Sequence, residues 1–164
     1  MIGSKMEAAL NAQIKEEMYS SYLYLAMAAY FNSIDLPGFS SWMRVQAKEE
    51  EAHAMKLFDF IQERGGRVVL VAMKEPTKEW ASPLAAFEAA LAHERHITGR
   101  IDKLVDLARA GKDHATEVFL QWFVKEQVEE EASADAIVRR LGMIGESKNG
   151  LLMMDHQLGK RGAA

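Results

Sequence analysis

The segment WMRVQAKEEEAHAMKL (residues 42–57) decides the fold class, because it combines helical periodicity with polar residues in core positions. Residues three or four apart share one face of a helix. The face formed in this way consists of Trp42, Gln46, Glu50, His53 and Leu57. Its apolar ends are typical of a core-facing stripe, yet a carboxylate and an imidazole occupy its middle. Burying an isolated charge is very costly unless the group is neutralised or binds a metal ion. The segment therefore predicts a helix that carries metal ligands into a core.

On either side of this segment, the chain shows further long helical patterns. Only three prolines occur in 164 residues, which favours long helices over strands. Pro37 and Pro83 suit first helical positions, with Ser82 as an N-cap, whereas Gly142 and Gly145 are expected to end the fourth helix. The expected helices span about residues 4–32, 37–64, 82–110, 114–141 and 146–158. The residues expected to point inward from the fourth helix are Phe119, Trp122, Phe123, Ile137 and Val138.

The connection formed by residues 65–82 is unusually long for a compact domain. A long crossover in a bundle joins two parallel helices, whereas a short loop joins antiparallel ones. Within it, Arg67–Val71 is expected to be extended. We therefore expect an all-α fold in one domain, residues 1–164. It is a four-helix bundle of two antiparallel pairs, with one long crossover and a short fifth helix at the C-terminal end.

The composition restricts the possible functions. The chain has no cysteine, so any metal must be held by oxygen and imidazole ligands. A net charge of −4 gives no reason to expect a nucleic acid or a membrane as a partner. The N-terminus does not resemble a signal peptide, and no apolar run approaches the ~20 residues that span a bilayer. We therefore expect a cytoplasmic protein.

The other three long helices also place a glutamate in the core stripe. Glu17, Glu94 and Glu130 each lie near the middle of a helix, in phase with the apolar residues around them. Together with Glu50 they supply four negative charges, which two Fe(II) ions or two oxide-bridged Fe(III) ions would balance. Carboxylates with one imidazole suit iron or manganese better than a thiolate-seeking ion.

The spacing of these residues shows an internal repeat of 77 residues. This step takes Glu17 to Glu94, His53 to Glu130 and Glu50 to Gln127. The symmetric di-iron plan of helical bundles uses one Glu from each of two helices and E-x-x-H from each of the other two. This chain keeps one E-x-x-H and has Q-x-x-E in the second half. A lone mid-helix Glu is usually solvated, and an acidic run is usually surface. Here, however, the four glutamates and His53 all lie on core-facing stripes and are in register with the 77-residue repeat, which favours a metal site.

Four motifs resemble those of the bacterial and archaeal non-haem ferritins, over almost the whole chain. They are EMYSSYLYL (17–25), EEEAHAM (49–55), ERGGR (63–67) and FLQWFVKEQVEEE (119–131). The resemblance implies iron storage, with a ferroxidase centre that oxidises Fe(II) to Fe(III) using O2 or H2O2. It also implies that the ferric mineral is stored in a hollow homo-oligomeric cage of twenty-four subunits.

The resemblance also implies roles for single residues. Glu17, Glu50 and His53 would bind the first iron, with Glu50 as a bridge to the second. Glu94 and Glu130 would complete the second iron's ligands. Gln127 would position the bound oxidant. Tyr24 would be a one-electron donor, although a core tyrosine with a satisfied hydroxyl explains it equally well. Glu49, Glu126 and Glu129 would form a third iron site that shares Glu130, and the alternative for the last two is a solvated surface.

The sequence also bears on related protein families and on alternative functions. Bacterioferritins have a methionine after the bridging Glu and hold haem with it; this chain has Glu51, so no haem is expected. A di-iron peroxidase or oxygenase that never stores iron is a rival function. A metal-free helical interaction protein is another. The stretch Met18–Phe31 is apolar nearly all round, which favours a homo-oligomer. The histidines expected on the surface are His93, His96, His114 and His156.

Overall fold

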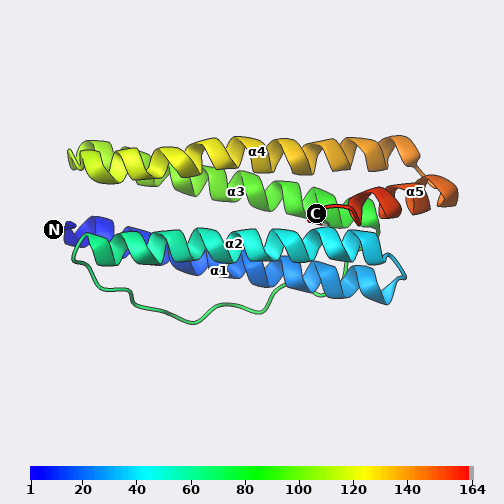
Figure 1. The fold of residues 1–164 in the computed structure, drawn as a ribbon, viewed down its shortest axis with the longest axis horizontal. Coiled ribbons are helices and arrows are strands. Elements are labelled where there is room, and N and C mark those ends of the chain that lie inside the picture. Colours follow the sequence, from blue (N-terminus) through cyan, green and yellow to red (C-terminus); the bar gives the residue numbers. More distant parts are fainter. Residues whose placement is uncertain (163–164) are drawn as a thin grey trace.

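The computed structural model describes residues 1–162 as a bundle of four long helices and a short fifth one (Figure 1). The helices are α1 (Ser4–Ser33), α2 (Pro37–Glu63), α3 (Pro83–Ala110), α4 (His114–Ile144) and α5 (Lys148–Leu158). No strand occurs in this part of the chain. The predicted all-α class, the long crossover and the short fifth helix are confirmed, and most helix ends lie within two residues of the expected positions.

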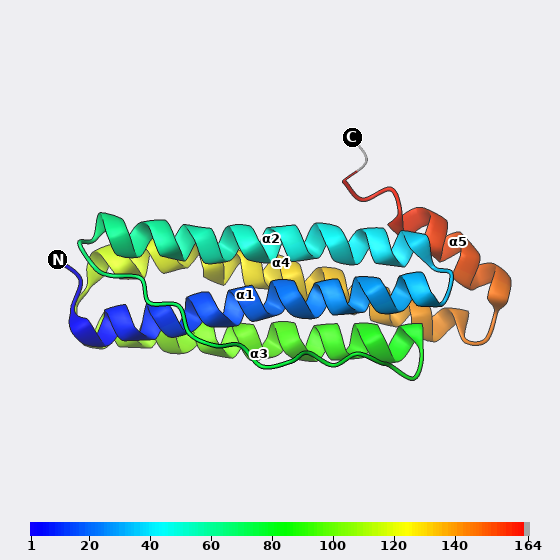
Figure 2. The same ribbon diagram turned by 90° about the horizontal axis from the view of Figure 1, so that it is seen from below.

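Two antiparallel hairpins, α1 with α2 and α3 with α4, form the bundle (Figure 1). The crossover from residue 64 to 82 runs the length of the bundle, so α2 and α3 point in the same direction, as a long connection predicts. Figure 2 shows it passing over α1. Asn11 attaches it there, since its amide donates to the Arg67 carbonyl at 2.9 Å and accepts from the Val69 N–H at 2.7 Å.

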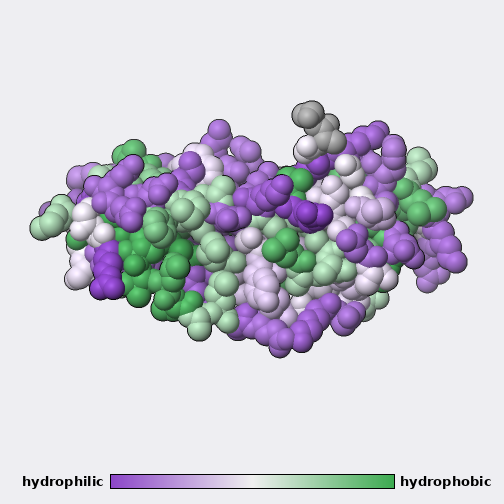
Figure 3. Space-filling view, turned by 60° about the horizontal axis from the view of Figure 1, so that its bottom comes forward, coloured by the Kyte–Doolittle hydropathy of each residue, from purple (hydrophilic) through white to green (hydrophobic). Residues whose placement is uncertain are grey.

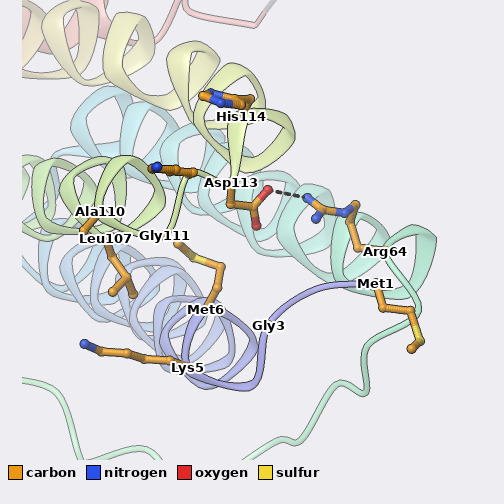
Figure 4. Close-up of a pocket in the computed structure, with 11 residues that line it drawn as sticks. Met1, Gly3, Lys5, Met6, Arg64, Leu107, Ala110, Gly111, Asp113 and His114 are labelled. Atoms are coloured by element: carbon orange, nitrogen blue, oxygen red, sulfur yellow. Dashed lines mark hydrogen bonds and ion pairs between the residues drawn. The ribbon is translucent and has the colours of Figure 1, made fainter.

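Side-chain caps define the N-termini of both helices of the second hairpin, α3 and α4. The Ser82 hydroxyl accepts from the Ala85 N–H at 3.1 Å, as expected for an N-cap before Pro83. Asp113 caps α4 by accepting from the Thr116 N–H at 3.1 Å, and it also accepts from Arg64 at 3.0 Å. Figure 4 shows this ion pair at the end of the bundle, beside a cavity of about 530 Å³. No predicted ligand lines that cavity.

Two details of α4 differ from the prediction. The helix continues through Gly142 and ends at Gly145, whose φ of 55° lies in the left-handed region. A glycine within a helix costs only about 1 kcal/mol, whereas the left-handed turn at Gly145 stops the helix. Trp122 was expected to point inward, but its side chain is 37% exposed. It lies one position before the buried Phe123, about 100° further round the helix, so it covers the edge of the core.

The hydrophobic core is divided into two clusters by a layer of buried polar residues. One cluster contains Leu23, Met27 and Phe31 of α1, and the other contains Leu10 and Ile14 of the same helix. Each cluster includes residues from all four long helices. The polar layer between them consists of Gln13, Glu17, Gln46, Glu50, His53, Glu94, Gln127 and Glu130, none more than 6% exposed. This layer holds the candidate site.

Large apolar side chains remain uncovered on the surface of the single chain. Tyr22 and Leu25 of α1 are 49% and 47% exposed. Met55 and the crossover residues Val69–Val71 line a groove between the crossover and the first hairpin. Figure 3 shows a broad hydrophobic area on the face turned toward the viewer. None of the described helices is both long enough and apolar enough to cross a lipid bilayer.

Candidate metal centre

The structure brings five of the predicted ligands together in the polar layer. Glu17, Glu50 and His53 present one ligand atom each within 4.8 Å of one another, and so do Glu50, Glu94 and Glu130. The two sets share Glu50, which therefore lies where a carboxylate bridging two metal ions would lie. Two cations side by side, each held by buried oxygen ligands and one of them also by an imidazole, fit this arrangement.

Amide side chains one turn before two of the ligands orient the carboxylates. The Gln13 amide donates to Glu17 Oε1 at 2.7 Å. The Gln46 amide donates to Glu50 Oε1 at 3.0 Å and to Glu130 Oε2 at 2.6 Å, so it bridges α2 and α4. These bonds hold the carboxylates in place before any metal arrives, which reduces the reorganisation that binding requires.

Glu94 differs from Glu17 in how many hydrogen bonds it already accepts. Tyr24 donates its hydroxyl proton to Glu94 Oε1, and Gln127 donates to Glu94 Oε2 at 3.1 Å. Gln127 also reaches Thr98 at 3.4 Å. In contrast, Glu17 Oε2 is the one buried side-chain polar atom within residues 1–162 that has no hydrogen-bond partner. Such an atom is costly to bury, and a metal ion would satisfy it.

Burial makes the carboxyl groups of the layer weak acids. Burial, with the charge of Glu50 next in importance, raises the pKa of Glu17 to about 8. Burial and then the charge of Glu94 raise the pKa of Glu130 to about 7. Burial also raises the pKa of Glu94, and that of Glu50 well above its usual value. Near neutral pH the layer therefore holds protons in the absence of a cation, and a metal ion would displace them.

Aromatic rings enclose the imidazole of His53. The rings of Trp122 and Phe123 pack edge-on against it, with centroids 5.3 and 6.1 Å away. The Nδ1 atom of His53 lies 3.4 Å from Glu50 Oε2. Lys56 places its ammonium 4.3 Å from the centroid of the Trp122 ring. Trp122 thus closes the site from outside, although it was expected in the core itself.

The residues predicted to form a third iron site are not all brought together. Glu126 is half-buried and forms a set with His53 and Glu130, again within 4.8 Å. Glu129 is exposed, and Glu49 forms an ion pair with Arg161. The geometry therefore associates Glu126 with the main site and holds Glu49 through a residue from the C-terminal segment. The third site stays a prediction.

Sequence reasoning missed several residues that support the site. Gln13 and Gln46 each precede a ligand by four residues, so an amide one turn before a core glutamate was an available signal. Arg100 donates to Gln13 Oε1 at 2.9 Å, and Arg161 donates to Gln46 Oε1 at 2.8 Å. Neither arginine has a local pattern that indicates this role, because each comes from another helix or segment.

One histidine expected on the surface is largely enclosed. His93 forms a 2.7 Å hydrogen bond with Ser20 and packs against Tyr19. Burial, followed by the charge of His96, lowers the pKa of His93 to about 4, so its ring is neutral at pH 7. His93 precedes Glu94 on α3 and faces α1 because the two hairpins pack there. His96, His114 and His156 are exposed, as expected.

Comparisons with known proteins give the family to which the chain belongs. A family model described as "Ferritin-like domain" matches residues 7–144. A bacterial non-heme ferritin of Bacteroides fragilis is 44% identical over 161 residues, which cover 98% of this chain and 100% of that protein. A bacterial non-heme ferritin of Staphylococcus epidermidis is 40% identical over 98% of this chain and 97% of that protein.

Solved structures show the same fold. An open-pore ferritin from the hyperthermophilic archaeon Archaeoglobus fulgidus superposes with a TM-score of 0.96 and is 60% identical, covering 97% of this chain and 98% of that one. The resemblance indicated by the four sequence motifs is therefore confirmed. With matches to the family model and to relatives over almost its full length, the chain belongs to the ferritin family.

Proposed function

We propose that this protein stores iron: it binds two Fe(II) ions in the polar layer, oxidises them with O2 or H2O2, and keeps the ferric product inside a hollow assembly of its own copies. The observation that carries the proposal is the pair of buried ligand sets that share Glu50. They interrupt a core that is otherwise apolar. Membership of the ferritin family supports iron storage as the function.

The negative charges of the polar layer match the charge of two iron ions. Glu17, Glu50, Glu94 and Glu130, once ionised, balance two Fe(II) ions, and an oxide bridge keeps the balance after both become Fe(III). His53 adds one neutral ligand to the first ion. Because burial weakens these acids, the entry of each cation expels protons that the layer holds. The site therefore passes between a protonated and a metal-bound state without an uncompensated buried charge.

The oxidation step needs two electrons, and each Fe(II) ion supplies one. They reduce O2 to H2O2, or H2O2 to two water molecules, with protons from solvent and from the displaced carboxyl groups. Tyr24 contacts Glu94 directly, so we assign it the role of a one-electron donor that would supply the second electron when only one Fe(II) ion is bound. Gln127 holds Glu94 and would orient the oxidant. Glu126 extends the ligand cluster toward solvent and, with Glu49 and Glu129, would receive the departing Fe(III).

The surface of the single chain supports the proposed self-assembly. Tyr22, Leu25 and the groove beside Met55 expose apolar area that a second copy would cover. The presence of a hollow assembly also distinguishes iron storage from the rival functions. A di-iron peroxidase or oxygenase needs only the two ions of its own site and has no need of a cavity.

Aerobic loading with Fe(II), followed by sizing and an iron count, tests the proposal. We expect a large, closed particle by light scattering that retains far more than two iron ions per chain. A monomer or dimer that keeps only two ions would favour the peroxidase or oxygenase. A chain that retains no iron would favour the helical interaction protein.

The two ions of the site are expected to be held unequally. Both oxygens of Glu94 already accept hydrogen bonds, and the repeat places the neutral Gln127 where a carboxylate would otherwise be. Glu17, in contrast, offers a free oxygen next to His53. Crystals soaked anaerobically in Fe(II) should therefore show full occupancy at His53, lower occupancy between Glu94 and Glu130, and a weak third peak near Glu126 and Glu129.

The anomalous signal of iron gives these occupancies without reference to activity. Equal and complete occupancy of both core positions, with no density near Glu126, would indicate a permanent di-iron cofactor. The role proposed for the layer in passing iron onward would then be wrong.

A further inference from the structure

The C-terminal end of α5 packs closely against the start of α2 (Figure 2). A Cβ atom on Gly38 would lie only 1.7 Å from the Asp155 carbonyl oxygen, so only glycine fits this position. A Cβ atom on Gly159 would lie 3.3 Å from the Gly38 Cα atom, which is a close but less tight approach. The Asp155 carboxylate also accepts from the Phe39 N–H at 3.0 Å, at the N-terminus of α2. The end of α5 is therefore clamped to the start of α2.

This contact places Arg161 against the first half of α2. Its guanidinium carbon lies 4.3 Å from the centroid of the Trp42 ring. One nitrogen donates to Gln46 Oε1 at 2.8 Å, and the other donates to the Glu49 carboxylate. The three partners lie on successive turns of α2, so the planar guanidinium spans them together. Arginine suits this role because its donors form a rigid fork that also stacks on aromatic rings.

The contact with Gln46 has a consequence for the metal ligands. The Gln46 amide oxygen faces Arg161, so its NH2 group faces Glu50 and Glu130 and donates to both. If the amide were reversed, its oxygen would face two carboxylates, and neither could accept a hydrogen bond from it. Arg161 thus determines which end of the amide faces the site, although it touches no ligand of the second metal position itself.

We propose that Arg161 is a positioning residue of the metal centre, which acts through Gln46 to hold Glu50 and Glu130 ready for the second metal ion. The C-terminal segment is therefore part of the site. This inference rests on the proposed function, because it assumes that the layer binds two cations. A positioning role and a purely electrostatic role predict opposite results. If the Arg161 guanidinium acted only by its charge, it would repel incoming cations, and its removal would strengthen cation binding.

The test is an anaerobic titration of the assembled protein with Co(II), followed by visible absorbance and calorimetry. Arg161→Ala should weaken the second Co(II) by roughly two- to tenfold, the range expected for one net hydrogen bond. Binding of the first Co(II), beside His53, should weaken less, because Gln46 holds only one of its ligands, Glu50, whereas it holds both Glu50 and Glu130 for the second ion. Lys160→Ala is the matched control, because Lys160 is the adjacent, exposed basic residue. It removes the same charge and should leave both affinities unchanged.

A double-mutant cycle tests whether the effect passes through Gln46. In a Gln46→Met background, which has no amide to orient, Arg161→Ala should cause no further loss. The proposal is overturned by tighter or unchanged binding in Arg161→Ala, by the same loss in Lys160→Ala, or by an undiminished loss in the Gln46→Met background. If the unmodified protein fails to take up two Co(II) ions per chain, the proposed function itself fails, which is a separate result.

Discussion

Replacing His53 or Glu50 with alanine is expected to slow the first turnover of Fe(II) oxidation by more than about 100-fold. Loss of a residue that merely supports a metal ligand typically costs 10- to 100-fold in affinity or activity, so loss of a direct ligand should exceed that range. His53 is the only imidazole in either core set, and Glu50 belongs to both. Stopped-flow absorbance of Fe(III) formation, at two Fe(II) ions per chain, gives the rate.

The neighbouring residues provide the controls. Glu51→Ala removes an exposed carboxylate adjacent to Glu50, and His96→Ala removes an exposed imidazole, so both should oxidise Fe(II) at the original rate. Light scattering should show that all four variants assemble alike, because the two apolar clusters are untouched. An undiminished rate in His53→Ala would show that oxidation takes place elsewhere.

The metal-free protein is expected to lose stability as the pH rises from about 6.5 to 8. The Glu17 carboxyl ionises near pH 4.5 when unfolded and near pH 8 when buried. Between these values the folded chain binds a proton that the unfolded chain has lost, so the free energy of unfolding falls with pH. Between pH 6.5 and 8 the loss from Glu17 alone is on the order of 2 kcal/mol, at about 1.4 kcal/mol per pH unit. Glu130, with its pKa of about 7, adds a loss of the same sign.

Denaturant midpoints measured across this pH range, with and without Co(II), check the expectation. Co(II) should reverse the trend, because it binds the ionised carboxylates and its affinity grows with pH. His93 does not interfere: its lowered pKa makes the free energy of unfolding rise with pH only between about pH 4 and 6.5, and it has no effect above that range. Glu17→Gln keeps the shape of the side chain but removes the titration, so its midpoint should depend less on pH. If the variant depends on pH as strongly as the original protein, the carboxyl of Glu17 is not the source.

Periodicity was sufficient to predict the helices and the level of the site. A glutamate that shares a helix face with an apolar stripe is expected to be buried. Because the helices of a bundle run nearly parallel, four such glutamates near the middle of their helices are expected to lie in one layer. The geometry of Glu17, Glu50, His53, Glu94 and Glu130 was accessible for this reason. Gly142 was misjudged because glycine only weakens a helix, whereas a left-handed turn such as that at Gly145 ends it.

The features that sequence did not reveal depend on packing between distant segments. Whether Trp122 enters the core or covers its edge depends on a rotation of about 100°, which a one-dimensional stripe does not resolve. His93 is enclosed only because α1 and α3 meet beside it. The contact of Arg161 with Gln46 joins residues 115 positions apart through the fold of α5, and no local pattern anticipates it.

The division of the core into two apolar clusters keeps the helices in place whatever occupies the polar layer between them. Each apolar cluster joins all four long helices on its own side of the polar layer. The four helices are thus held together by apolar packing on both sides of the polar layer. Changes in bound protons or cations are confined to the layer itself. Under the proposed function, a rearrangement of the polar layer would leave the helices in register, so the ligands would return to the same positions for the next pair of ions.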